Sequence, residues 1–134
     1  MAFELTTDQA LGSMPFCGTI GVAFTAVAAD ECRAILPWAP ERCTIGGAMH
    51  GGAVMALADG VGAVVAFLNL PEGGVGTTTV SSATNFLRGV RDGHVEAISR
   101  PLHAGRTTIV VETELLDADG KRVAKVTQTQ AVLR

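Results

Sequence analysis

A single carboxylate interrupts the most apolar stretch of this 134-residue chain. Asp59 is the one ionisable side chain between Gly51 and Leu70. A carboxylate among apolar side chains must be desolvated, paired or used in a reaction. It could act as a general base or a nucleophile, or it could hydrogen-bond a neighbouring strand or a second subunit. Asp59 is therefore the first candidate catalytic residue, with a structural role as the alternative.

A histidine and two glycines, His50-Gly51-Gly52, precede this stretch where a helix is expected to begin. Backbone N–H groups in the first turn of a helix have no partner within the helix and carry the positive end of its dipole. Glycines leave those groups accessible because no side chain covers them. A carbonyl oxygen that gains negative charge during acyl transfer would be stabilised there. Close packing at a sharp turn is the structural alternative for the two glycines.

Other common catalytic motifs are missing from the sequence. It contains no GxSxG, GxxxxGK[ST] or HExxH pattern, and Cys17, Cys32 and Cys43 lack metal-ligand spacing. We therefore expect no metal site and no disulfide framework. His94 and His103 lie on expected strands or at their ends, where a structural or solvent-facing role is the simpler interpretation.

Turn residues and alternating apolar residues surround one long apolar helix, predicted at residues 53–68. Two strands are expected before the helix and a four-stranded meander after it, at residues 19–28, 31–36, 77–87, 94–99, 107–116 and 122–133. Residues 91–93 and 117–120 contain the Asp and Gly typical of hairpin turns. We predict an α+β fold in which a curved antiparallel sheet wraps around one long helix that is buried on nearly every side.

Length and charge limit the class of protein. A chain of 134 residues is expected to form one domain, residues 1–134. Ten basic and thirteen acidic residues give a net charge of -3, which offers no general attraction for nucleic acid or an anionic membrane. Residues 53–70 are about as long as a membrane span, but Asp59 near their middle favours a buried helix of a soluble protein. The N-terminus does not resemble a secretory signal, which together with the unpaired cysteines predicts a cytoplasmic protein.

The spacing HGG-x6-D, here His50-Gly51-Gly52 followed by Asp59, resembles the signature of hotdog-fold acyl-CoA thioesterases of the phenylacetate-degradation (PaaI-like) subgroup. Asn85-Phe86-Leu87-Arg88 and Gly105-Arg106 also resemble that family. The resemblance covers roughly residues 15–134 and leaves residues 1–15 as an expected N-terminal extension. It implies a hotdog fold and hydrolysis of an acyl-CoA thioester, with an aryl or arylacetyl group favoured and no cofactor, since coenzyme A is part of the substrate.

The resemblance also implies residue roles. The Gly51 N–H is expected to bind the thioester carbonyl and Asp59 to act as general base or nucleophile, with His50 beside them. Thr44 stands where many relatives have Asn, so rate or substrate choice is expected to differ, and Thr77 is the favoured hydroxyl after the helix. The residues expected to hold the substrate and its coenzyme A part are Gly52, Arg88, Gly105 and Arg106.

Helix geometry adds an expectation about assembly. Gly51 and Asp59 are eight residues apart, which separates them by about 12 Å along one helix. One carbonyl group cannot touch both, so the acid would come from a second chain whose helix runs antiparallel beside the first. We therefore expect a homodimer and, from the family, a homotetramer. The alternatives are a non-catalytic acyl-CoA or small-acid binding module and a hotdog hydratase or dehydratase, whose usual His-Phe-Pro-Gly element is missing.

Overall fold

The structure is a computed structural model that describes residues 3–134. This part of the chain contains one long helix, two short helices and six strands, with two single-turn 3-10 helices ahead of the long helix. The elements are α1 (Thr7–Gly12), α2 (Pro15–Ile20), β1 (Ala23–Val27), β2 (Cys32–Pro37), α3 (Gly51–Leu68), β3 (Gly76–Phe86), β4 (His94–Ala104), β5 (Thr108–Asp117) and β6 (Arg122–Leu133).

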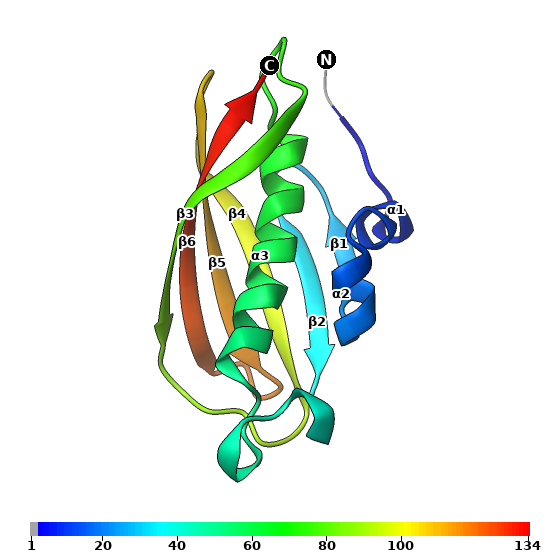
Figure 1. Cartoon of the computed structure of the whole chain (residues 1–134), viewed down its shortest axis with the longest axis vertical. Coiled ribbons are helices and arrows are strands. Elements are labelled where there is room, and N and C mark those ends of the chain that lie inside the picture. The colour runs from blue at the N-terminus through cyan, green and yellow to red at the C-terminus, as the bar shows by residue number, and fades with distance from the viewer. Residues whose placement is uncertain (1–2) are drawn as a thin grey trace.

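All six strands form one antiparallel sheet in the order β1-β2-β4-β5-β6-β3. The sheet curves around α3, which runs along its concave side (Figure 1). Buried residues alternate along β5 and β6, so each of these strands presents one face to the helix. The predicted α+β class, a curved antiparallel sheet wrapped around one long helix, is confirmed.

The predicted four-stranded meander is wrong in one respect. Of the four strands after α3, only β4, β5 and β6 are consecutive neighbours, whereas β3 pairs with β6 and forms an edge of the sheet. Residues 87–93 therefore carry the chain across the sheet from β3 to β4, and residues 91–93 are part of this crossover rather than a hairpin. The turn at residues 117–120 does join β5 and β6 as a hairpin, with Gly120 at φ 79°. Periodicity identifies strands but not the distant strand with which each one pairs.

The N-terminal segment is helical where a strand was expected to begin. Residues 19 and 20 belong to α2, which ends at Gly21 in the left-handed conformation (φ 96°), and β1 begins only at Ala23. Ala10 of α1 and Cys17 of α2 are buried in the core. Of the expected extension at residues 1–15, the first two residues lie outside the described part of the chain.

One face of α3 is exposed in the single chain, contrary to the prediction of a helix buried on nearly every side. Leu57, Val61 and Val65 are fully buried beneath the sheet, but Met55 and Asp59 are exposed on the opposite face. The helix is long and apolar enough to span a membrane, yet 56% of it is buried as the core helix of this domain. An apolar face left uncovered on a core helix is typical of a subunit interface.

Candidate active site

The start of α3 presents one unpaired backbone donor. His50 is the N-cap, and its Nδ1 accepts a hydrogen bond of 2.8 Å from the Gly52 N–H. The His50 N–H donates to the Arg42 carbonyl oxygen, which fixes the chain as it enters the helix. Within residues 3–134 the Gly51 N–H makes no hydrogen bond. It therefore remains free to bind an oxygen at the positive end of the helix dipole.

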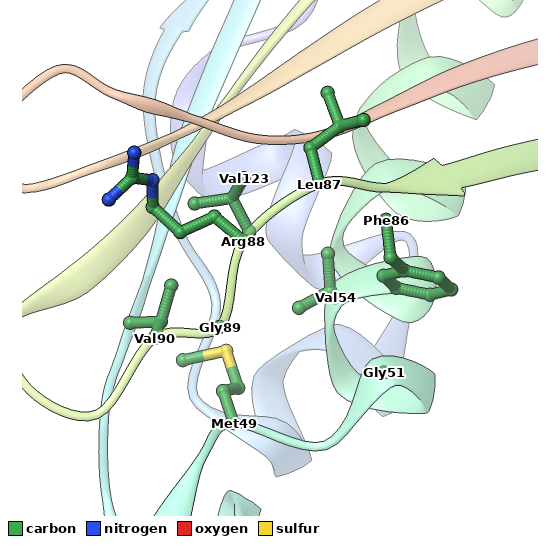
Figure 2. A pocket seen from close by; sticks show the side chains of 9 residues that line it. All are labelled: Met49, Gly51, Val54, Phe86, Leu87, Arg88, Gly89, Val90 and Val123. Carbon is green, nitrogen blue, oxygen red and sulfur yellow. The ribbon is translucent and has the colours of Figure 1, made fainter.

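A cavity of about 400 Å³ lies beside this donor. Figure 2 shows the Phe86 ring against the first turn of α3, and a Cβ atom added at Gly51 would lie 3.2 Å from that ring. The Arg88 side chain extends from the other side of the cavity and away from Gly51 (Figure 2). The lining residues are Met49, Gly51, Val54, Phe86, Leu87, Arg88, Gly89, Val90 and Val123. This cavity combines an open backbone donor with apolar walls and a cation at its edge.

Asp59 lies two turns farther along α3 and is held by a strand residue. Its Oδ1 accepts a hydrogen bond of 3.0 Å from Nε2 of Gln128 on β6. The Asp59 side chain is exposed to solvent, yet protein atoms crowd one side of the carboxylate, and this burial raises its pKa above the usual range. The Gln128 bond opposes that rise because it favours the ionised form. Burial, and then the nearby Asp59 charge, raise the pKa of the Cys17 thiol.

A second cavity of about 430 Å³ opens one helical turn beyond Asp59. It lies between α3, the N-terminal segment and the start of β3, and its lining residues are Leu5, Ser13, Met14, Ala63, Val64, Phe67, Gly76 and Thr77. The N-terminal segment packs tightly here: a Cβ atom added at Gly60 would lie 2.6 Å from the Cys17 Sγ and 3.8 Å from the Met14 side chain. The cavity is mostly apolar, and Ala63, one turn beyond Asp59, is its first lining residue on α3, so it suits an apolar group.

The predicted site residues fall into separate groups within one chain. His50, Gly51, Gly52 and Arg88 lie at the beginning of α3, and Asp59 lies two turns farther along it. Thr77 of β3 lines the second cavity, where its neighbours from α3 are Ala63, Val64 and Phe67. Gly105 and Arg106 form the turn between β4 and β5, at the opposite end of the sheet (Figure 1).

Arg134 fixes the position of that turn. Its guanidinium donates to the carbonyl oxygens of Arg106 (2.7 Å) and Glu72 (3.2 Å), just beyond the end of α3. An 18-residue helix is about 27 Å long, so Arg106 and Gly51 are far apart in one chain. Thr44 lies exposed in the loop before α3, where its N–H donates to the Ala48 carbonyl oxygen, and its side chain makes no hydrogen bond with the described residues.

Two residues of the site were missed from the sequence. Gln128 occupies an inward-facing position of β6 between Val126 and Gln130, so a polar residue on the apolar face of a strand was the available signal. Phe86 belongs to the motif Asn85-Phe86-Leu87-Arg88, but its contact with Gly51 joins distant segments and is not predictable from the sequence. Among residues 3–134 no three potential metal ligands lie together.

Comparison with known proteins identifies a family. Residues 46–124 match the Thioesterase superfamily, a span that contains His50, Gly51, Asp59 and Arg106. PA1618 of Pseudomonas aeruginosa is 32% identical over 114 residues, which are 85% of this chain and 79% of the relative. The structure of a mutant of that thioesterase has a TM-score of 0.90 at 28% identity and covers 98% of this chain and 96% of its own.

Two further proteins, one similar in sequence and one in structure, support the same family. The 1,4-dihydroxy-2-naphthoyl-CoA hydrolase of Escherichia coli is 28% identical over 125 residues, which are 93% of this chain and 91% of the relative. A mutant of the phenylacetic acid degradation protein PaaI of Thermus thermophilus has a TM-score of 0.81 at 26% identity and covers 89% of this chain and 99% of its own. The resemblance noted in the sequence is thereby confirmed: the chain belongs to the Thioesterase superfamily and is a hotdog-fold thioester hydrolase.

Proposed function

We propose that this protein hydrolyses an acyl-CoA thioester at a site shared by two antiparallel chains. The observation that carries the proposal is the separation, about 12 Å along α3, between the unpaired Gly51 N–H and the partly desolvated Asp59. A two-fold axis beside α3 would bring Gly51 of one chain close to Asp59 of the other, and would do so twice. Thr77 and Arg106 of the second chain would then lie beyond its Asp59, closer to this Gly51 than the same two residues of its own chain do.

Exposed surfaces support this dimer. Met55 and Asp59 lie on the uncovered face of α3, and β3 is an edge strand of the sheet. Val80 on that strand is 62% exposed and Phe86 is 51% exposed. An edge strand with apolar side chains is prone to pair with another chain, and a second copy would cover both the strand and the helix face. We further propose that these dimers pair into tetramers.

The chemistry follows from these groups. The thioester carbonyl oxygen accepts the Gly51 N–H, which stabilises the negative charge that develops on it. The Asp59 carboxylate of the second chain removes a proton from an attacking water, or attacks the carbonyl carbon itself. The carbon–sulfur bond then breaks and coenzyme A leaves as a thiolate. In the general-base route the thiolate takes the proton that Asp59 removed from water, and in the nucleophilic route it takes a proton from the water that later hydrolyses the anhydride. In the nucleophilic route water hydrolyses the resulting anhydride, so both routes release one carboxylic acid and one thiol.

His50 adds a second donor to this site. Since its Nδ1 accepts the Gly52 N–H, the neutral ring carries its hydrogen on Nε2. That N–H can donate to the carbonyl oxygen or to the departing sulfur. The arrangement gives Gly52 an indirect role, because its N–H orients the His50 ring.

The two cavities suggest how the substrate lies. The cavity beside Gly51 would receive the chain that links the thioester to the nucleotide, with Arg88 and Arg106 of the second chain near the phosphates. The cavity next to Asp59 would hold the acyl group, and its volume of about 430 Å³ with mostly apolar walls suits an aryl or arylacetyl group. The name of the E. coli relative, a naphthoyl-CoA hydrolase, supports an aromatic acyl-CoA.

Free cysteines support a reducing compartment. Cys17, Cys32 and Cys43 form no disulfide within residues 3–134. We propose that the protein acts in the cytoplasm as a single domain.

The direct test measures thiol release from a panel of CoA thioesters by the parent and by Asp59→Asn. We expect release to be fastest with aryl or arylacetyl groups and to fall by about 10²- to 10⁴-fold in Asp59→Asn. Asp92→Asn, a change at an exposed acid in the crossover loop, is the matched control and should retain parent activity. Binding of every ester without thiol release would instead indicate a binding module. Hydration of an enoyl-CoA without thiol release would indicate a hydratase.

A further inference from the structure

Four polar side chains are fully or almost fully buried in the core: Ser99, Thr113, Gln128 and Gln130. The hydroxyls of Ser99 and Thr113 bond each other at 2.5 Å, and Gln130 Nε2 donates to the Thr79 hydroxyl at 2.8 Å. Gln128 differs because its Nε2 donates to the Asp59 carboxylate, a group of the proposed active site. Gln128 is 0% exposed and thus reaches Asp59 from beneath the helix.

The Gln128 amide is satisfied on one side only. Its Oε1 is buried and has no hydrogen-bond partner among residues 3–134. A buried carbonyl oxygen without a partner opposes folding, and an apolar side chain at this position would avoid that cost. The neighbouring inward-facing residue Val126 shows that the strand accommodates such a side chain. Packing by itself therefore does not account for a glutamine here.

A glycine in the middle of α3 makes room for the amide. A Cβ atom added at Gly62 would lie only 1.9 Å from the Gln128 Oε1, so any larger residue at position 62 would displace the amide. Glycine in a helix interior also lowers helix stability. Gly62 and Gln128 thus combine two unfavourable features, and what they achieve together is the hydrogen bond to Asp59.

We propose that Gln128 is a positioning residue that holds Oδ1 of Asp59, so that the carboxylate keeps one orientation and its second oxygen stays available for reaction. The inference rests on the proposed role of Asp59. The donated N–H also stabilises the ionised carboxylate, which the apolar surroundings would otherwise disfavour. Gln128 contributes to neither cavity wall, so it acts through Asp59 and not through the substrate.

Few titratable groups other than the Gln128 contact can change the pKa of Asp59. Cys17 of α2 is the one whose pKa responds to Asp59 among the described residues, and β3 carries no charged side chain. The charged residues of β2, β4, β5 and β6 lie at outward-facing positions, where many form ion pairs: Arg33 with Glu31 and Glu96, Arg100 with Glu31, Arg122 with Glu114, and Lys125 with Glu112. A change in the titration of Asp59 after substitution of Gln128 therefore reports on their hydrogen bond.

The test compares the pH dependence of kcat/KM in Gln128→Met with that of Gln130→Met. Both changes replace a buried glutamine of β6 by an apolar side chain of similar length, but Gln130 bonds Thr79 and not Asp59. In Gln128→Met we expect kcat to fall by about 10- to 100-fold and KM to stay within about twofold. The acid limb of the profile, the pH range over which kcat/KM falls as the Asp59 carboxylate is protonated, should move to higher pH. Gln130→Met should leave the acid limb in place. Acid limbs that coincide in the parent and Gln128→Met would overturn the proposal.

Two further measurements test the Gln128–Asp59 contact even if Gln128→Met does not fold or Asp59 is not catalytic. Gln128→Glu preserves the shape beside Gly62 and places a second acid against Asp59, so its acid limb should move to higher pH even if Gln128→Met does not fold. Carbon-13 NMR titration of the Asp59 carboxyl, assigned with Asp59→Asn, reports the contact without hydrolysis. An upward shift of this titration in Gln128→Met, while Asp59→Asn still hydrolyses the substrate, would support the contact and reject the proposed function. An unchanged titration would reject the contact.

Discussion

Two inactive variants are expected to restore activity to one another when they share a dimer. Gly51→Pro removes the N–H proposed to bind the carbonyl oxygen, and Asp59→Asn removes the base or nucleophile. In a mixed dimer one site combines an intact Gly51 with an intact Asp59, while the other site carries both defects. If Gly51 and Asp59 of the same chain formed the site, every site in every dimer would carry one defect.

The structure indicates that Gly51→Pro is compatible with the fold. Gly51 is the first residue of α3, where proline is well tolerated, and its N–H has no partner to lose within residues 3–134. His50 has φ -60° and ψ 134°, a conformation suited to the residue before a proline. Gly51→Ala is the matched control because it keeps the N–H. Its Cβ atom would approach the Phe86 ring at 3.2 Å, and that half-exposed ring has room to move.

The expected magnitude follows from counting sites. Loss of one oxyanion donor lowers kcat by about 10²- to 10³-fold, so each variant by itself is nearly inactive. When equal amounts of the two variants exchange subunits freely, about half of the dimers are mixed. Each mixed dimer has one intact site of its two, so thiol release should return to roughly a quarter of the parent value. Thiol release is measured before and after exchange, with circular dichroism and sizing to establish folding and mixing. A fully exchanged mixture that stays inactive would refute the shared site.

Other predictions follow from the same structure. Burial raises the folded-state pKa of Asp59, so ionisation of this carboxyl opposes folding at pH values above that pKa. The destabilisation disappears below the unfolded-state pKa, where the carboxyl is protonated in both states. Asp59→Asn should therefore raise Tm at about pH 7 but not at about pH 3. Arg106→Ala and Arg88→Ala should weaken use of a CoA ester by about tenfold and spare a short thioester without the nucleotide; equal losses would indicate structural roles. Ala63→Leu should narrow the cavity next to Asp59 and lower kcat/KM for an aryl-CoA more than for acetyl-CoA. Leu57→Ala should lower the free energy of unfolding by about 2–5 kcal/mol in denaturant titrations, because Leu57 is fully buried.

Local patterns in the sequence determined the elements and the chemistry of the candidate site. The lone carboxylate Asp59 in an apolar run, and the glycines before it, indicated a helix with an open first turn and a functional acid. The helix period also determined that Gly51 and Asp59 are too far apart to act together in one chain. These conclusions depend on spacing along one helix, which the sequence contains directly.

Contacts between distant segments were decided only by the tertiary structure. The sequence did not determine that β3 pairs with β6, that Phe86 lies against Gly51, or that residues of the N-terminal segment line a cavity one helical turn beyond Asp59. The same holds for the bond from Gln128 to Asp59, which joins residues 69 positions apart. Such contacts depend on strand order and on side-chain packing between elements, and local propensity and periodicity contain neither.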